Sequence, residues 1–286
     1  MTYPRLLKWA GSKAKEAPDI FRACRLDDLE DGVSREEKVC EMFAGSAAFT
    51  GYRALGGPAA PEPWAPPTLL IDVNPALMAL FRVVRDRPLA LVDQYLEWYL
   101  CCNGVMDRAF YAKVRDELLP QNYELVRAAA LLFLNRSSWN GLYRTNKEGR
   151  NNVPPGLKEG EPLAPVDEAA IDFWHLALQQ TRLVCGDFTM CWASDADVFF
   201  VDPPYPEKFT GYATEAGQVD MVHLAQFCEA LVKRGKRVVA TLPGAEELMA
   251  LWTPFCDVLP LERHSQMGAL TAGDHAPLGQ VMLVSR

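Results

Sequence analysis

Four consecutive residues, Asp202-Pro203-Pro204-Tyr205, place a carboxylate, a rigid backbone corner and an aromatic ring side by side. They follow the apolar run 198–201, which is typical of a buried parallel strand. Because two prolines cannot continue a central strand, the strand is expected to end there. The carboxylate and a backbone carbonyl can accept both hydrogens of an exocyclic amino group, while the ring stacks on a planar base. The tetrapeptide suggests chemistry on that amino group, and the alternative is a simple proline turn.

Three further strand ends carry small or acidic residues. The loop Phe43-Ala44-Gly45-Ser46 precedes a predicted helix, and small residues there let a ligand approach free backbone N–H groups. The loop does not match GxGxxG, so a dinucleotide site is poorly supported. A tight strand-to-helix turn is the other interpretation of these residues.

Two aspartates complete the set of strand ends. Asp72 ends the second predicted strand and can bond the hydroxyls of a ribose, or else help Asn74 to cap the next helix. Asp187 follows the third strand in Gly186-Asp187-Phe188, where it can accept a hydrogen bond from an adenine amino group. Ligands of open α/β sheets bind at the carboxyl ends of strands, so the four ends predict one cleft for cofactor and substrate.

The rest of the chain predicts an α/β sheet interrupted by helices. Helices are expected at 47–55, 168–180, 220–233 and 244–252, with strands at 38–43, 68–73, 182–185, 197–201, 237–242, 256–261 and 280–284. Between them, helices are expected at 89–101, 106–118 and 123–134, followed by a β-hairpin over 142–153 with its turn at 146–149.

Composition limits the class of protein. The chain of 286 residues is 49% hydrophobic, which is ample for a core, and it has no apolar stretch long enough to span a bilayer. The N-terminal residues lack the apolar region of a signal peptide, so we expect a cytoplasmic protein. Eight cysteines without CxxC spacing are expected to be reduced, and four scattered histidines predict no metal site.

The charge is unevenly distributed. A net charge of -8 and a pI near 5.1 argue against a nucleic-acid partner when taken alone. However, residues 1–15 contain four cations and no acid, and residues 136–158 contain five cations and one acid. These two segments would permit salt-sensitive DNA binding. The third basic cluster, 233–237, is interpreted as a solvated turn at a helix C-terminus.

Several motifs occur together in one order along nearly the whole chain. They are Lys8-Trp9-Ala10-Gly11-Ser12-Lys13, Phe43-Ala44-Gly45-Ser46, Ile71-Asp72-Val73-Asn74-Pro75, Asn135-Arg136, Asn140-Gly141-Leu142-Tyr143-Arg144, Asn152-Val153-Pro154 and Asp202-Pro203-Pro204-Tyr205. In this order the chain resembles the Dam-type DNA adenine-N6 methyltransferases.

The resemblance implies transfer of a methyl group from S-adenosylmethionine, leaving S-adenosylhomocysteine, to N6 of a flipped-out adenine in double-stranded DNA. It implies a Rossmann-like sheet, mixed but mostly parallel with helices on both faces, and a monomer or weak dimer in a bacterial or phage-infected cell. Residues 1–75 and 166–286 would form the catalytic domain, and 76–165 an inserted, mainly helical target-recognition domain carrying a β-hairpin.

The resemblance also implies roles for individual residues. The catalytic set is Asp202, Pro203, Pro204 and Tyr205. The cofactor set is Trp9, Lys13, Phe43, Ala44, Gly45, Ser46, Asp72, Asp187, Phe188 and Asp202. The DNA-binding set is Lys8, Arg136, Asn140, Leu142, Arg144, Lys147 and Arg150.

The chain also departs from the family pattern. Ala47 stands where a second glycine is common, and the connector 56–67 is expanded. Segment 140–144 makes GATC the first expectation for the recognition sequence, but Arg150-Asn151 replaces an acidic residue and an aromatic. Two other functions fit the motifs, namely cytosine-N4 methylation and DNA or cofactor binding without catalysis.

Overall fold

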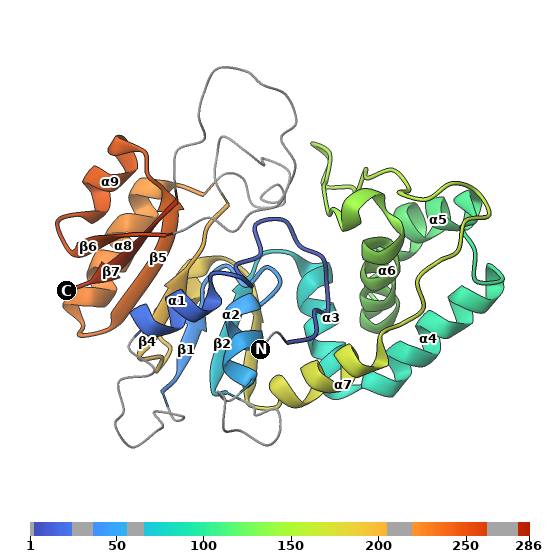
Figure 1. Ribbon diagram of the computed structural model, residues 1–286, viewed down its shortest axis with the longest axis horizontal. Coiled ribbons are helices and arrows are strands. Elements are labelled where there is room, and N and C mark those ends of the chain that lie inside the picture. Colours follow the sequence, from blue (N-terminus) through green and yellow to red (C-terminus); the bar gives the residue numbers. More distant parts are fainter. Residues whose placement is uncertain (1–2, 25–36, 56–65, 205–218, 262–279) are drawn as a thin grey trace.

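The computed structural model describes residues 3–24, 37–55, 66–204, 219–261 and 280–286. Their strands form one sheet in the order β3-β2-β1-β4-β5-β7-β6 (Figure 1). The first five pair in parallel, and β7 is antiparallel to both of its neighbours. The bounds are β1 (Val39–Glu41), β2 (Thr68–Asp72), β3 (Thr181–Cys185), β4 (Val198–Val201), β5 (Arg237–Pro243), β6 (Cys256–Pro260) and β7 (Gln280–Ser285).

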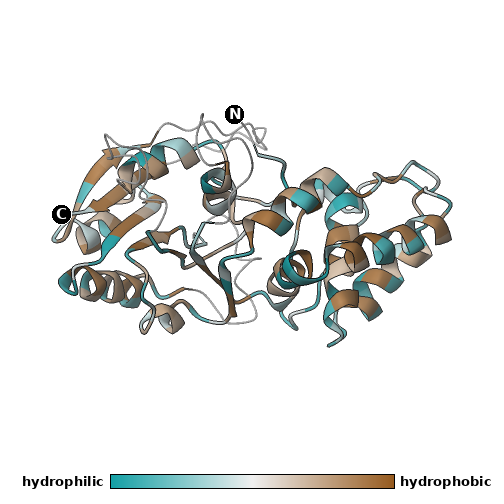
Figure 2. Ribbon diagram, turned by 90° about the horizontal axis from the view of Figure 1, so that it is seen from below, coloured by the Kyte–Doolittle hydropathy of each residue, from teal (hydrophilic) through white to brown (hydrophobic). Residues whose placement is uncertain are grey.

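Helices cover both faces of the sheet, as predicted. One face packs on α1 (Ala17–Ala23), α2 (Ala48–Ala54), α3 (Pro75–Asp86) and α7 (Glu168–Ala177). The other packs on α8 (Met221–Lys233), α9 (Glu246–Trp252) and the 3-10 turn η3 (Phe188–Cys191). Alternate residues of each strand serve the two faces, because side chains alternate across a strand. Figure 2 shows this pattern, with apolar strands between helices that carry both apolar and polar residues.

The remaining helices lie beyond α3, at the end of the molecule opposite β6 and β7 (Figure 1). They are α4 (Pro88–Cys101), α5 (Arg108–Lys113), the π-helical turn η1 (Val114–Leu118), α6 (Glu124–Ser137) and the 3-10 turn η2 (Trp139–Gly141). Phe133 on α6 makes ring contacts with Tyr95, Trp98 and Phe110. This apolar cluster continues through α3 to the sheet, so the two regions share one core.

Local chemistry explains where α3 begins. The Asn74 side chain accepts hydrogen bonds from the backbone N–H groups of Ala76 and Leu77, at 3.0 and 3.2 Å. Pro75 then occupies the first helical position, where a missing N–H costs nothing. The predicted cap and the start of this helix are both confirmed, and they fix the direction in which the chain leaves β2.

Two features of the secondary structure were not predicted correctly. Residues 142–153 reverse direction at the predicted turn, but their antiparallel pairing is limited to one bridge between Thr145 and Asn151, with flanking backbone hydrogen bonds from Asn146 to Arg150 and from Asn152 to Arg144. The reason is that Asn146 accepts the N–H groups of Glu148 and Arg150, which commits the backbone to a side-chain-capped turn. Helix α1 was missed, because its seven residues are too short for a clear apolar period.

None of the helices within the described residues is long and apolar enough to cross a membrane.

Candidate active site

The predicted motifs meet where the order of the sheet reverses. From β1 the chain proceeds outward through β2 and β3 on one side, and through β4 and β5 on the other. Ligands of open α/β sheets bind in the crevice outside the carboxyl ends of the strands at such a reversal point. Glu41 pairs with Phe200 in the register of these strands, so the loop from Phe43 and the motif from Asp202 start at the same level.

Asp202 is held through both of its carboxylate oxygens. Lys13 Nζ donates to Oδ2 at 2.7 Å, and the Thr241 hydroxyl donates to Oδ1 at 2.6 Å. Lys13 also donates to the carbonyl oxygen of Gly11, and only 5% of its side chain is exposed, against 17% for Asp202. The carboxylate is thus oriented by two elements far apart in the sequence and keeps a partly open face.

The residues after Asp202 are only partly described. Pro203 is buried and Pro204 is half-buried, and both come directly after Asp202 at the end of β4. Tyr205 lies outside the described residues. The two prolines explain why β4 ends at Val201, since neither can donate to a neighbouring strand.

Asp72 links the predicted cofactor loop to β2. Its Oδ2 accepts the N–H of Gly45 at 3.0 Å, and its Oδ1 accepts the N–H of Asn74 at 2.9 Å. Burial raises the pKa of Asp72, although the two backbone hydrogen bonds oppose the rise. Gly45 has a positive φ of 49°, and a Cβ atom there would lie 3.3 Å from the Trp9 ring. Glycine at this position therefore allows both the turn and the close ring.

Two aromatic rings lie next to each other at the start of the loop after β1. The rings of Phe43 and Phe188 lie 5.8 Å apart, and Phe188 is buried while Phe43 is half-buried. Asp187 is exposed and accepts the N–H of Thr189, which starts the turn η3. An exposed carboxylate next to two aromatic rings can receive a planar heterocycle that bears an amino group.

The segment from Lys8 to Lys13 contacts three other parts of the site. Trp9 stacks on Tyr143 with ring centroids 5.9 Å apart. The Ser12 and Ser46 hydroxyls are 2.9 Å apart. The segment therefore connects the cofactor loop, the Asp202 carboxylate and the region after α6.

Asn135 anchors the beginning of that segment. Its Oδ1 accepts the N–H of Lys8 at 2.9 Å, and its Nδ2 donates to the carbonyl oxygens of Lys8 and Gly141, both at 2.7 Å. Asn135 is buried in the last turn of α6, so its amide satisfies backbone groups of two loops. This places the exposed Lys8 side chain beside the segment that begins at Trp139.

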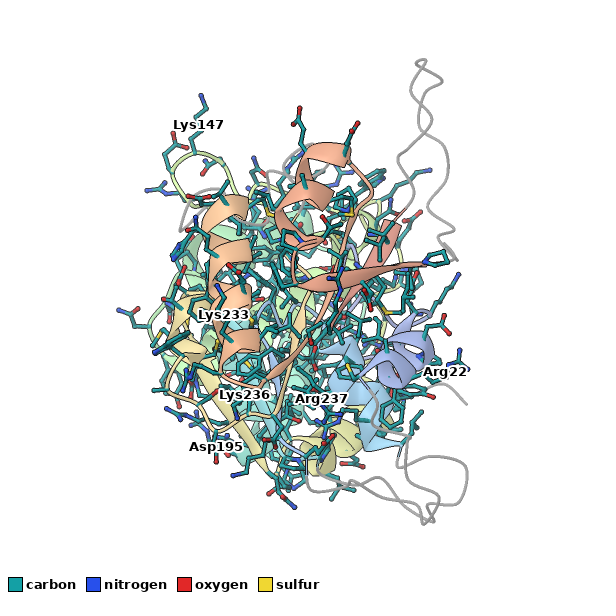
Figure 3. All side chains as sticks on the ribbon, turned by 90° about the vertical axis from the view of Figure 1, so that its left-hand side faces the viewer. Arg22, Lys147, Asp195, Lys233, Lys236 and Arg237 are labelled. Atoms are coloured by element: carbon teal, nitrogen blue, oxygen red, sulfur yellow. The ribbon has the colours of Figure 1, made fainter. Side chains whose placement is uncertain are left out.

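The predicted DNA-binding residues are unequally exposed. Asn140, Arg144, Lys147 and Arg150 are exposed and Leu142 is half-buried. Arg144 Nε donates to Asn152 Oδ1 at 2.8 Å, which steadies the guanidinium. Figure 3 shows Lys147 pointing outward at the end opposite Lys236 and Arg237.

Arg136 has a different environment. It is half-buried beside Tyr95, and burial, partly offset by Arg136, raises the pKa of that tyrosine to about 12. The Arg136 Nε atom is buried and has no hydrogen-bond partner among the residues that the structure describes. These contacts place Arg136 in the core between α4 and α6.

Three side chains of the site were not selected from the sequence. They are Thr241, which donates to Asp202, Asn135, which accepts from Lys8, and Glu41 in β1. Glu41 accepts the N–H of Thr50 at 2.7 Å and also the Thr50 hydroxyl. Burial raises the pKa of Glu41 to about 7. The sequence could have pointed to Asn135, since this residue begins one of the quoted motifs. It could not have pointed to Thr241, because a threonine within an apolar strand matches no functional motif.

The arrangement can bind an amino group and a planar ring without a metal ligand set. Within the described ranges, no cluster of three or more His, Cys, Asp or Glu side chains could hold a metal ion. The crevice offers one oriented carboxylate, one buried cation, two aromatic rings and a loop of small residues before α2.

Comparisons with known proteins agree with this geometry. Residues 9–257 match the family described as D12 class N6 adenine-specific DNA methyltransferase. Type II methyltransferase M.MjaIII of Methanocaldococcus jannaschii is 29% identical over 82% of this chain and 82% of its own. DNA adenine methylase of Escherichia coli is 28% identical over 80% of this chain and 76% of its own. DNA N-6-adenine-methyltransferase of Escherichia phage P1 is 31% identical over 86% of this chain but 31% of its own length.

The predicted family, the α/β methyltransferase fold and adenine as the target base are confirmed by these matches. Adenine specificity also removes the need for the cytosine-N4 and non-catalytic alternatives. The match covers the loop after β1, the region after α6 and the motif after β4, which are the parts that meet in the crevice. The chain belongs to the D12 class N6 adenine-specific DNA methyltransferases and is an enzyme that methylates adenine at specific sites in DNA.

Proposed function

We propose that this enzyme transfers a methyl group from S-adenosylmethionine to N6 of an adenine that has left the stack of double-stranded DNA. The single observation that carries the proposal is the doubly held Asp202 carboxylate at the reversal point of the sheet. Two donors hold this carboxylate at the carboxyl end of β4, and 17% of its side chain stays exposed, so it can still accept a hydrogen bond from a base.

Asp202 and the carbonyl oxygen of Pro203 would accept the two hydrogens of the adenine amino group. The lone pair of that nitrogen is normally delocalised into the ring, which makes it a weak nucleophile. Two acceptors at a fixed angle favour a pyramidal nitrogen and a localised lone pair. The protein then acts mainly by positioning the reactants.

The residues around the loop after β1 fit the proposed cofactor by their chemistry. S-adenosylmethionine, when bound, supplies a methyl group on a positively charged sulfur. Phe43 and Phe188 would hold its planar ring, and Asp187 would accept the amino group of that ring. Asp72 is already bonded by Gly45 and Asn74, so it would hold the shape of the loop and offer its remaining lone pairs to hydroxyls.

The region beyond α3 would bind the duplex. We propose that residues 76–165 form the target-recognition domain and that 1–75 and 166–286 form the catalytic domain. Exposed Arg144, Lys147 and Arg150 would contact phosphates and base edges, and Leu142 would contact a base. Arg136, held beside Tyr95, would support this region from inside.

Removing the base from the helix costs a few kcal/mol, and stacking on an aromatic ring returns ~1–3 kcal/mol. We propose Tyr205 as that ring. The proposal assigns recognition to exposed side chains after α6 and chemistry to buried ones at the sheet, with Lys8–Lys13 running between them.

The test is Asp202→Ala with a duplex substrate and S-adenosylmethionine labelled in the methyl group. We expect labelled N6-methyladenine from the unaltered enzyme and none from the variant, while calorimetry finds the same cofactor affinity for both. Transfer at the unaltered rate by the variant would overturn the assignment of Asp202. Label transferred from the unaltered enzyme into single strands only would overturn the choice of double-stranded DNA.

A further inference from the structure

Thr241 lies beside Asp202 because of the register of two central strands. Val201 of β4 pairs with Ala240 of β5, so the next residues, Asp202 and Thr241, are neighbours at the carboxyl end of the sheet. Alternation puts both on the face that also carries Phe200 and Val239. Thr241 is fully buried, yet it carries a hydroxyl in a strand whose other inner residues are apolar.

Lys13 and Thr241, which both donate to Asp202, differ in how strongly their side chains are restrained. Lys13 reaches Oδ2 through a long side chain with four rotatable bonds. Thr241 reaches Oδ1 through a β-branched side chain with one rotatable carbon–carbon bond, fixed on a strand that is paired on both sides. The hydroxyl is therefore the rigid contact that sets the plane of the carboxylate.

We propose that Thr241 is a positioning residue for methyl transfer, acting through Asp202. The proposal rests on the function proposed above, because it requires Asp202 to accept a hydrogen of the target amino group. Without the hydroxyl, Oδ1 loses the contact that fixes the plane of the carboxylate, and the carboxylate presents a different lone pair to the adenine. Thr241 itself is assigned no contact with cofactor or DNA, so we expect both affinities to stay close to those of the unaltered enzyme.

The experiment compares Thr241→Val, which keeps the shape and removes the donor, with Thr241→Ser, which keeps the donor. Single-turnover transfer of labelled methyl to duplex DNA should slow about 10- to 100-fold in the valine variant, the range expected for one hydrogen bond to a charged group. The serine variant should stay within about threefold of the unaltered enzyme. Affinities for cofactor and DNA, measured by calorimetry, should not change in either.

Thr68→Val is the matched control. Thr68 is a buried threonine on β2 whose hydroxyl donates to the carbonyl oxygen of Pro66, at the opposite end of the sheet. It should lower the melting temperature without slowing methyl transfer. Thr241→Cys is a second variant of similar volume whose thiol is a weak donor. Its methyl transfer should be slowed as in the valine variant, and it replaces that variant in the test if Thr241→Val does not fold.

Thr241→Val with the unaltered rate would overturn the proposal. So would equal slowing in the serine and valine variants, or slowing that follows weaker cofactor or DNA binding. If Asp202→Ala itself transfers methyl groups normally, the function proposed for Asp202 fails. If Asp202→Ala is inactive and Thr241→Val is not slowed, only the role of Thr241 fails.

Discussion

The carboxyl end of β4 around Asp202 and the segment after α6 differ in how their charged side chains are paired. At the end of β4, Asp202 and Lys13 are largely buried and bonded to each other. After α6, Lys147 and Arg150 are exposed, and neither forms an ion pair with an acid among the described residues. The first region has its charged side chains paired within the protein, whereas the second presents exposed cations to its surroundings. Under the proposed function, chemistry and DNA affinity are therefore separated in space, and each is expected to change with little effect on the other.

The largest effect is expected from breaking the buried pair with Lys13→Met. It leaves Asp202 without its ammonium partner, and loss of one member of a buried pair costs about 3–5 kcal/mol. Because 17% of the Asp202 side chain is exposed, we expect a cost just below this range, about 2–3 kcal/mol of unfolding free energy, together with loss of methyl transfer. Urea unfolding and labelled-methyl assays measure the two effects.

Lys38→Met is the control, since Lys38 pairs with Asp195 on an open surface. It should change neither stability nor rate. Equal effects of the two substitutions would mean that the pair at Asp202 is no more organised than a surface pair.

The second-largest effect is expected in the pH dependence of the unfolding free energy, which depends on the buried carboxyl group of Glu41. Burial raises the pKa of Glu41 to about 7 from 4.5, so the folded protein holds this proton more tightly than the unfolded chain does. The stabilisation is complete below pH 4.5 and is lost as pH rises through 7, amounting to about 3 kcal/mol at most. Glu41→Gln, which stays neutral and can still accept from Thr50, should remove this fall in unfolding free energy between pH 5 and 8.

Glu97→Gln, at an exposed site on α4, controls for the loss of a carboxyl group. It should leave the pH dependence of stability intact. A Glu41→Gln variant with the same pH dependence as the unaltered enzyme would show that Glu41 does not titrate in this range.

The third effect concerns the exposed region. Arg144→Ala should lower kcat/KM on the preferred site by about 10- to 100-fold and relax the preference at one base pair, because an arginine–guanine contact contributes ~1–3 kcal/mol of discrimination. Rates on a set of duplexes, each altered at one position, measure it. Arg234→Ala is the control, since Arg234 lies over Trp192 at the far end of the molecule. A uniform loss over all duplexes would assign Arg144 to the phosphates instead.

The smallest effect is expected from Lys147→Ala. Removing one phosphate contact should reduce the slope of log affinity against log salt by about 1, with little loss of specificity. Lys233→Ala, at a lysine paired with Glu229 within α8, should leave the slope unchanged. Fluorescence anisotropy with a labelled duplex at several salt concentrations distinguishes them.

The sequence was informative where a rule of local chemistry applied. The ends of β2 and β4 and the cap of α3 follow from prolines, Asn74 and apolar runs, so they could be placed to within two residues. The predicted hairpin has its turn in the expected place but almost no strand pairing, because the extent of pairing depends on a competition for backbone groups that composition does not reveal. There, the side chain of Asn146 satisfies the backbone in a turn and leaves one bridge.

The side chains that line the crevice were harder to predict from the sequence than its position in the sheet. Asp202, Asp72 and Asp187 stand at strand ends, where the pattern points to them. Thr241 joins them only because β5 lies next to β4 in register, a relation between residues 39 positions apart. Contacts of this kind depend on the folded sheet, and no local pattern contains them.

The span of the Lys13–Asp202 contact has a consequence for how the enzyme is made. The two residues are 189 positions apart, and Lys8 and Asn135 are 127 apart. At about 5–20 residues per second, the ribosome needs roughly 10–40 seconds after Lys13 before it adds Asp202. Lys13 must therefore wait for Asp202 through the synthesis of α3 to α7. Contacts this distant also close slowly, so the nascent chain completes these helices well before the Lys13–Asp202 pair can form.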